Sequence, residues 1–197
     1  LRRQRQMCIR DRLLTALGFS CEVHANPAGV DLPILVAQRV EQPGLPTVLM
    51  YGHGDVVRGN AAKWEAGRDP WRLQVEGDRW YGRGTADNKG QHSINLEALR
   101  QVITARNGKL GFNTTWLIET GEEAGSPGLA AFCEAQRSAL AADVFIASDG
   151  PRLNAERPTL FMGSRGAVNF ELKLRARERG YHLSLIHISE PTRQAEI

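Results

Sequence analysis

The sequence has 197 residues, of which 42% are hydrophobic and 24% are charged, a balance that fits one sizeable globular core and the start of a second domain. No apolar stretch approaches the roughly 20 residues that span a bilayer, and no apolar secretion-signal segment follows the basic N-terminus, so membrane association is not expected. The formal charge of +3 and the pI near 9.0 come from five arginines within residues 1–12, whereas residues 13–182 are neutral, which removes the main support for nucleic-acid binding.

The three cysteines, Cys8, Cys21 and Cys133, have neither metal-binding nor redox-motif spacing. A sparse, odd number favours reduced thiols in a cytosol over a disulfide framework, which predicts a cytoplasmic protein. The two ends, RQMCIRDR and SLIHISEPTRQAEI, look like translated sequencing-adapter strings. We therefore expect residues 1–12 and 183–197 to be non-native tails. The alternative is a basic tail and a short C-terminal strand.

Apolar periodicity and turn residues predict alternating strands and helices. In chain order we expect a helix closed by Gly18, strands near residues 20–24, 35–41 and 47–51, loops over 58–86, a helix at 90–106, a strand at 114–120, a helix at 128–141 and a strand at 143–148. This order is typical of an α/β fold, here with a mixed, largely parallel sheet flanked by helices. After Pro158, alternating apolar residues from Val168 to Leu174 indicate the opening strand of a second domain.

Acidic side chains and one histidine stand where the predicted sheet strands end. They are His53 and Asp55 after TVLMYG, Glu122 and Glu123 after TTWLIETG, and Asp149 after DVFIAS. A fourth acidic segment places Asp87 in the glycine-flanked turn GRGTADNKG, just before the expected helix at 90–106. Ligands of open α/β sheets bind beyond the carboxyl ends of the strands, so parallel strands would gather these groups in one crevice. Carboxylates gathered this closely repel one another unless cations neutralise them. Imidazole with carboxylates suits zinc and is tolerated by cobalt or manganese.

Each of these residues also has a plainer interpretation. His53 alone would be a turn histidine, the Glu122–Glu123 pair a solvated turn, and Asp149 in SDGP ordinary turn chemistry. The ordered set of four motifs favours the metal hypothesis over these separate interpretations. Residues outside the set are expected to be structural or exposed (His24, His92), to pack in loops (Trp64, Trp71, Trp80) or to balance the acidic charge (Arg83, Lys89).

The order of the motifs resembles one family of enzymes. His-x-Asp after a strand, a glycine-rich turn with Asp shortly before Lys-Gly, Glu-Glu after the next sheet strand and a later strand-end Asp are similar to the dizinc exopeptidases and deacylases. That family includes acetylornithine deacetylase, succinyl-diaminopimelate desuccinylase, aminoacylase and carnosine dipeptidase. The similarity covers nearly all of residues 13–182, and DNKGQ and MGSRGAVNFELKLRAR lean toward the dipeptidase-like members. It implies a zinc-exopeptidase-like catalytic domain at residues 13–162 and the start of an α+β lid and dimerisation domain at 163–182.

The resemblance also implies a ligand set for two zinc ions, with Co²⁺ or Mn²⁺ as alternatives. His53, Asp87 and Asp149 would hold one ion, and Asp87 would bridge to a second ion that also takes Glu123. The family holds its bridging Asp before a cis peptide bond, so we expect the Asp87–Asn88 bond to be cis.

The remaining matched residues would carry the chemistry. Glu122 would be the general base on a water between the metals, which hydrolyses a peptide or N-acyl amide bond next to a free carboxylate. Asp55 would accept a hydrogen bond from the His53 imidazole and fix its orientation. Glu122 and Glu123 would differ in role because neighbouring residues of an extended chain point to opposite sides.

The sequence departs from the family pattern at one ligand. The family's second zinc takes a late His that nothing here matches, since His187 lies in the adapter-like tail. His182 in ERGYH resembles the lid-domain His that reaches the partner subunit's active site, which predicts a homodimer for the full-length protein. We therefore expect a fragment with an incomplete dimetal site. A non-catalytic metal-binding module and an inactive fragment remain alternatives, although the presence of Glu122 argues against a mere binder.

Overall fold

The computed structural model describes residues 11–150, 154, 156–163, 166, 168 and 170–172. The chain divides into two units, Leu1–Thr159 and Leu160–Ile197. The described residues of the second unit, among them Val168 and Phe170, lie outside any strand. The strand expected from Val168 onward is thus not seen in them, because a strand requires a partner for its backbone groups and no described residue pairs with this stretch.

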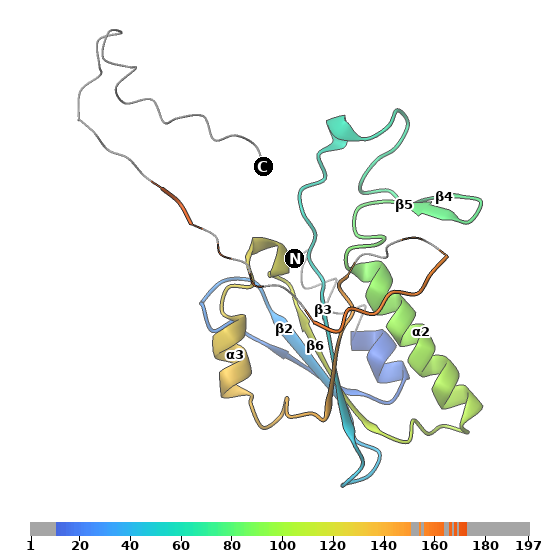
Figure 1. Cartoon of the computed structure of the whole chain (residues 1–197), viewed down its shortest axis with the longest axis vertical. Coiled ribbons are helices and arrows are strands. Elements are labelled where there is room, and N and C mark those ends of the chain that lie inside the picture. The colour runs from blue at the N-terminus through green and yellow to red at the C-terminus, as the bar shows by residue number, and fades with distance from the viewer. Residues whose placement is uncertain are drawn as a thin grey trace. The chain divides into compact units, whose positions relative to one another are not determined.

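The first unit is built around a five-stranded sheet with the strand order β1-β2-β6-β3-β7 (Figure 1). Its strands are β1 (Ser20–His24), β2 (Ile34–Arg39), β3 (Thr47–His53), β6 (Asn113–Glu119) and β7 (Val144–Ala147). Strand β3 is parallel to both β6 and β7, whereas β2 is antiparallel to β1 and to β6. The mixed sheet with parallel central strands is the one predicted from the sequence, and it brings the carboxyl ends of β3, β6 and β7 to one edge.

Helices cover both faces of this sheet (Figure 1). On one face, α2 (Lys89–Ala105) and the helix at residues 11–16 contribute to a core that includes Leu14, Leu35, Met50, Leu96, Leu99, Trp116 and Ile118. On the other face, α3 (Leu129–Ala135) contributes Phe132 to a core with Ile34, Val36, Leu117 and Leu140. Because alternate residues of β2 and β6 supply opposite cores, β6 is buried along its whole length.

The helix ends follow local backbone chemistry. The first helix closes as predicted at Gly18, where φ is +82° and the N–H of Phe19 donates to the Leu14 carbonyl at 3.1 Å. Helix α3 ends at Ala135, earlier than the helix expected over residues 128–141, because residues 136–140 turn and bring Leu140 into the core. Among the described residues, no helix has the length and apolar character that crossing a membrane requires.

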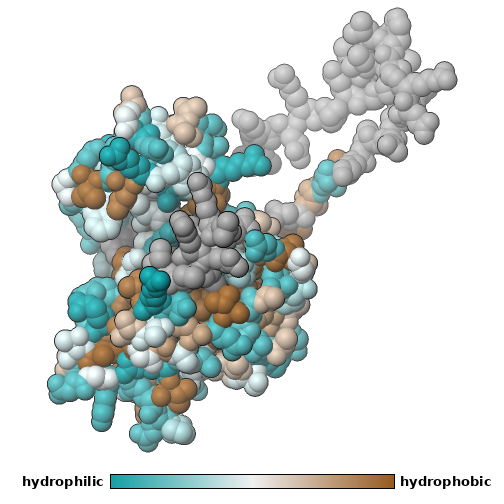
Figure 2. Space-filling model, turned by 180° about the vertical axis from the view of Figure 1, so that it is seen from behind, coloured by the Kyte–Doolittle hydropathy of each residue, from teal (hydrophilic) through white to brown (hydrophobic). Residues whose placement is uncertain are grey.

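Residues 58–86 contain more regular structure than the loops expected there. They form the short 3₁₀ helix η1 (Ala61–Lys63) and a hairpin of β4 (Gln74–Glu76) and β5 (Arg79–Tyr81). Strands of three residues are too short to show a period in the sequence. The Trp64 ring packs as expected, with Nε1 donating to the Gly59 carbonyl at 2.8 Å. Trp71 and Trp80 remain 61% and 65% exposed, so their packing is partial. Figure 2 shows hydrophobic residues scattered over the surface among hydrophilic ones.

Candidate metal centre

The predicted site residues gather around the end of β3. His53 is the last residue of β3 and lies opposite Glu119, the last residue of β6. The turn after β6 contains the 3₁₀ helix η2 (Glu122–Ala124), Asp149 follows β7, and Asp87 precedes α2. Four segments that are far apart in the sequence therefore meet at the fully buried imidazole of His53.

Two groups of ligand-type atoms adjoin the Nε2 atom of His53. In the first group, Asp87 Oδ1 lies 2.9 Å and Asp149 Oδ1 lies 3.6 Å from this nitrogen. In the second group, Glu122 Oε2 lies 3.7 Å away and Glu123 offers a further carboxylate oxygen. Within each group, one ligand atom from every residue lies within 4.8 Å of the others. Ligand atoms that each lie about 2 Å from one zinc ion are at most about 4 Å apart, and the three printed distances from Nε2 fall below that limit.

Asp55 connects the histidine to the turn that carries the two glutamates. Its Oδ1 lies 3.3 Å from Nδ1 of His53, close enough for an ion pair although the buried Nδ1 has no well-aligned hydrogen bond. The two oxygens of Asp55 also accept hydrogen bonds from the backbone N–H groups of Glu122 at 3.3 Å and Glu123 at 3.1 Å. One carboxylate therefore holds the strand end and the η2 turn together.

The charges of the cluster shift the pKa values of its members. Burial lowers the pKa of His53, but Asp55 and the nearby charges of Asp149 and Glu122 outweigh it and raise this pKa to about 9. Burial raises the pKa of Glu122, and the neighbouring carboxylates add to this effect while His53 opposes it. Burial also raises the pKa of Asp149, with Asp87 adding to it. Burial is thus the larger cause of the raised carboxyl pKa values, and repulsion among the carboxylates around the imidazole adds to it.

The donor set fits a divalent metal ion. Asp87, Glu122 and Asp149 each place an oxygen within 4 Å of one imidazole, and they come from three different loops. A divalent cation would relieve their repulsion, and imidazole with carboxylate oxygens is a ligand set that zinc accepts. Neither Cys21 nor Cys133 belongs to either group.

Asn88 lies at the centre of the hydrogen bonds beneath the first group. Its side chain is fully buried, and its amide contacts the backbone of His53, the ring of His92 and the carboxylate of Asp149. A β-carbon at Gly52 would overlap both His92 and Asn88. The strand can approach α2 this closely only because Gly52 has no side chain.

Glu119 supports the η2 turn from the protein interior. This carboxylate is 2% exposed, and its Oε1 accepts hydrogen bonds from the Tyr51 hydroxyl at 2.6 Å and the Ser126 hydroxyl at 2.7 Å. The N–H of Ser126 donates to the Gly121 carbonyl at 2.9 Å and closes the turn. Sequence reasoning missed the roles of Asn88 and Glu119. An asparagine before a helix is not a ligand type, and Glu119, although it ends β6, lies before the Glu122–Glu123 pair that the motif order selects.

Two sequence-based expectations about the local backbone have different outcomes. The Asp87–Asn88 peptide bond is cis, as predicted. The expectation that Glu122 and Glu123 lie in an extended segment is wrong, since both belong to η2. Successive residues of a 3₁₀ helix point about 120° apart rather than to opposite sides, which lets both carboxylates join one group with His53.

Two further residues considered from the sequence, His24 and Arg83, belong to neither ligand group. The ring of His24 contacts Phe132 edge-on, and Arg83 donates to the Gly59 carbonyl and lies over the Trp64 ring. His182, expected to contact substrate in a partner subunit, lies outside the described residues.

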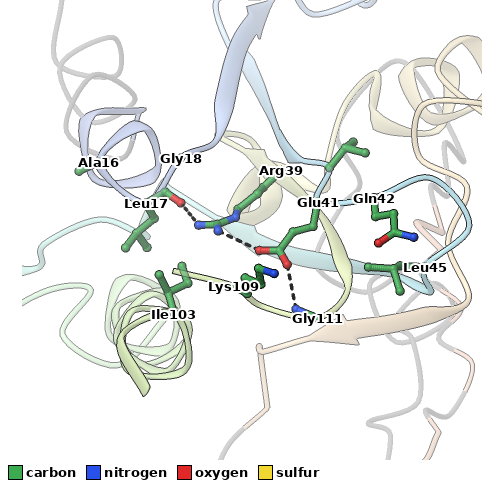
Figure 3. Close-up of a pocket in the computed structure, with 11 residues that line it drawn as sticks. Ala16, Leu17, Gly18, Arg39, Glu41, Gln42, Leu45, Ile103, Lys109 and Gly111 are labelled. Carbon is green, nitrogen blue, oxygen red and sulfur yellow. Dashed lines mark hydrogen bonds and ion pairs between the residues drawn. The ribbon is translucent and has the colours of Figure 1, made fainter. Parts of the chain in front are cut away.

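A cavity of about 770 Å³ lies near the amino end of β3, away from the candidate ligands (Figure 3). Two of its charged groups, Arg39 and Glu41, are engaged in hydrogen bonds within the protein. Arg39 donates to the carbonyls of Leu17 and Gly108 and to Glu41, at 2.5, 2.6 and 2.8 Å. Glu41 in turn accepts hydrogen bonds from the N–H groups of Leu110 and Gly111, at 2.6 and 2.9 Å. This network ties the first helix to the loop after α2.

Residues 49–196, which include every candidate ligand, match the sequence profile described as Peptidase family M20/M25/M40. The chain belongs to this family. The family resemblance drawn from the order of the motifs is thereby confirmed. The matched range also includes residues 183–196, whose non-native origin stays a prediction.

Several proteins similar to this chain are dipeptidases by name. The chain is 34% identical over 163 residues to the cysteinylglycine-S-conjugate dipeptidase of Corynebacterium striatum, which covers 82% of this chain and 35% of the relative. It is 31% identical over 154 residues to the beta-Ala-His dipeptidase of Rattus norvegicus, covering 76% and 30%. The crystal structure of human carnosine dipeptidase 1 matches with a TM-score of 0.66 and 28% identity over 74% of this chain and 32% of that chain. The chain thus spans about a third of the length of these relatives.

Proposed function

We propose that this chain is part of a metal-dependent hydrolase that cleaves a peptide or N-acyl amide bond next to a free carboxylate. The observation that carries the proposal is a buried imidazole with carboxylates from three loops within 4 Å of it, in a member of a peptidase family. The dipeptidase names of the relatives favour a dipeptide over an N-acyl amino acid as the substrate class.

The proposed metal is zinc, two ions per complete site, with Co²⁺ or Mn²⁺ as alternatives. His53, Asp87 and Asp149 would hold one ion, and Glu123 would contribute to the second, with Asp87 as the bridging ligand. When bound, such ions acidify a water molecule and polarise the carbonyl of the scissile bond.

Glu122 is the proposed general base. Its raised pKa, caused first by burial, brings its protonation closer to neutral pH, which suits a group that accepts a proton from water and returns it to the leaving amine. Asp55 binds the backbone N–H of Glu122 and faces Nδ1 of His53, so it orients the base and the histidine together.

The cellular location, the domain organisation and the assembly of the protein are also proposals. The unpaired thiols of Cys21 and Cys133 support a cytoplasmic location. Residues 163–182 would begin a lid and dimerisation domain after a catalytic portion at 13–162, and His182 would contact substrate in the partner subunit of a homodimer. Residues 1–12 and 183–197 would be non-native tails.

The decisive experiment combines metal analysis with turnover. The product of the source gene, read past residue 182, is purified, assayed for bound metal, and screened against dipeptides and N-acyl amino acids. Glu122→Gln should keep its metal and lose at least about 100-fold in kcat, since general acid–base groups contribute about 10²–10⁴-fold. Glu134→Gln, a change at an exposed carboxylate on α3, is the matched control and should keep full activity.

The outcomes separate this proposal from its alternatives. Removal of metal with a chelator should abolish turnover, and zinc should restore it. Metal binding without turnover of any substrate in the screen would favour a non-catalytic metal-binding module. Undiminished turnover of Glu122→Gln would remove Glu122 from its assigned role.

A further inference from the structure

Asn88 is the buried amide that connects the three residues of the first ligand group. It follows Asp87 directly and precedes the first residue of α2. Its side chain is fully buried, so its polar atoms depend on protein partners. Those partners belong to the segments that carry His53 and Asp149.

The carbonyl oxygen of the Asn88 side chain faces β3 and α2. Oδ1 accepts a hydrogen bond from the backbone N–H of His53 at 3.1 Å and also contacts Nε2 of His92. The bond to His53 fixes the distance between the end of β3 and the start of α2.

The amino group of the same side chain faces the segment after β7. Nδ2 donates to the Ser148 carbonyl at 2.6 Å, to Asp149 Oδ1 at 2.9 Å and to Gln91 Oε1 at 2.5 Å. An amide NH₂ has two hydrogens, so three acceptors compete for it. The charged Asp149 is the strongest of them, because hydrogen bonds to ionised acceptors are about twice as strong as neutral ones.

The two ligand groups are thus held by different side chains. Asp55 secures the turn of Glu122 and Glu123 through two backbone N–H groups, whereas Asn88 reaches Asp149 and adjoins Asp87. His53 belongs to both groups, but it is also placed by its pairing with Glu119 in the sheet. Asp149 lies beyond the last residue of β7 and has no such ladder to hold it.

We propose that Asn88 is a positioning residue that holds Asp149 for the metal position of His53, Asp87 and Asp149, whereas the position that takes Glu123 depends on the turn held by Asp55. The inference rests on the proposed metal centre. Loss of the Asn88 amide frees Asp149 and leaves the Asp55-held turn in place.

The test is a Co²⁺ titration of the metal-free product of the source gene, read past residue 182, followed by visible absorption and by calorimetry, together with thermal unfolding of the metal-free protein. Asn88→Ala should weaken one of two Co²⁺ equivalents by about 10–100-fold, the usual effect of losing a partner that orients a ligand. The other equivalent should change less than about threefold.

Asn95→Ala is the matched control. Asn95 lies on the same helix, and its Nδ2 donates to the Ser148 hydroxyl at 2.7 Å, so it also holds the segment after β7. It makes no contact with a candidate ligand among the hydrogen bonds of the described residues. Asn95→Ala should therefore leave both affinities within about threefold. If Asn88 acted only as packing between α2 and this segment, the two variants would lower metal affinity alike.

A double-mutant cycle tests whether Asn88 acts through Asp149. In an Asp149→Asn background, Asn88→Ala should cause little further loss of affinity, because coupled residues are not additive. Full additivity, equal weakening of both equivalents, or no weakening of either would overturn the proposal.

The remaining outcomes are also decisive. If Asn88→Ala does not fold, Asn88→Ser keeps a small polar group and should show the same selectivity more weakly; failure of both to fold would make Asn88 a folding residue and overturn the inference. A wild-type chain that binds no Co²⁺ refutes the metal centre itself. A wild-type chain that binds Co²⁺ unaffected by Asn88→Ala refutes only the role of Asn88.

Discussion

Gly52 is the point at which β3 comes closest to α2. His92 and Asn88 are 1% and 0% exposed and lie against the backbone of Gly52. The next residue along the strand is His53, whose imidazole faces the carboxylates. The absence of a side chain at one position thus determines how tightly the base of the candidate site is packed.

Gly52→Ala should destabilise the protein by about 1–3 kcal/mol, the usual cost of forcing an extra group into a packed interior. The new β-carbon would overlap His92 and Asn88. Urea unfolding at equilibrium measures the change in the free energy of unfolding. Gly163→Ala is the control, because nothing lies within 4 Å of a β-carbon there, and equal stabilities of the two variants would contradict this account of the packing.

The sequence could reveal the candidate ligands but not the residues that support them. His53 and Asp149 were predictable because acidic or imidazole groups at the ends of parallel strands meet at one edge of a sheet. Asp87, in the turn before α2, was predictable from the family resemblance of that turn. Asn88 and Glu119 were not, since an asparagine before a helix and a glutamate ending a strand give no sign of burial. Their roles depend on partners such as Tyr51, which stands 68 residues away in the sequence.

The connection after β6 shows how local geometry can differ from the sequence-based expectation. The strand itself was predictable from its apolar run, and its predicted and observed bounds nearly coincide. The Glu122–Glu123 turn was expected to be extended and instead forms η2. Its shape is stabilised by Asp55 from another strand end, and sequence periodicity carries no information about such a distant contact.

The Arg39–Glu41 network joins the end of the first helix to the loop after α2 (Figure 3). It lies at the end of the sheet that is opposite to the candidate ligands. Hydrogen bonds from the backbone N–H groups of Gly111 and Leu110 lower the pKa of Glu41 below its ordinary value of 4.5, and Arg39 adds to this effect. A lowered pKa in the folded state means that the ionised carboxylate stabilises the fold above about pH 4.5, and that this contribution disappears as the pH falls through the folded-state pKa.

Glu41→Gln should therefore lower the free energy of unfolding by about 1–3 kcal/mol at pH 7 and by progressively less toward pH 3. Chemical denaturation across this pH range measures the difference from the wild type. Glu134→Gln, at an exposed position on α3, should show no comparable loss at pH 7. A Glu41→Gln deficit that stayed constant down to pH 3 would contradict the assigned contribution of the carboxylate.

Strand β7 is an edge of the sheet with apolar side chains in contact with solvent. Val144, Phe145 and Ile146 are 48%, 61% and 40% exposed, and β7 pairs only with β3 among the described strands. Exposed apolar edge strands are templates for pairing with another chain. The exposed edge of β7 is therefore a surface that favours self-association of the chain.

The 197-residue chain should self-associate in a concentration-dependent manner, and Ile146→Lys should reduce this association, because a charged side chain at an edge opposes strand pairing. Size-exclusion chromatography with light scattering measures the mass over a range of concentrations. Ile94→Lys changes an equally apolar residue, 62% exposed on α2, and should leave the association unchanged. A monomeric wild type at all concentrations, or an equal effect of both variants, would contradict this role of the edge.

The parallel pairing of β3 also determines when the protein can complete its centre during synthesis. His53 lies in a strand whose partners begin only at Asn113 and Val144. A ribosome that adds about 5–20 residues per second needs roughly 5–20 seconds to travel from His53 to Asp149. Until β6 has been synthesised the nascent β3 has neither neighbour, and it lacks β7 until almost the end of that interval. Its apolar side chains are therefore available to chaperones before the full set of candidate ligands exists.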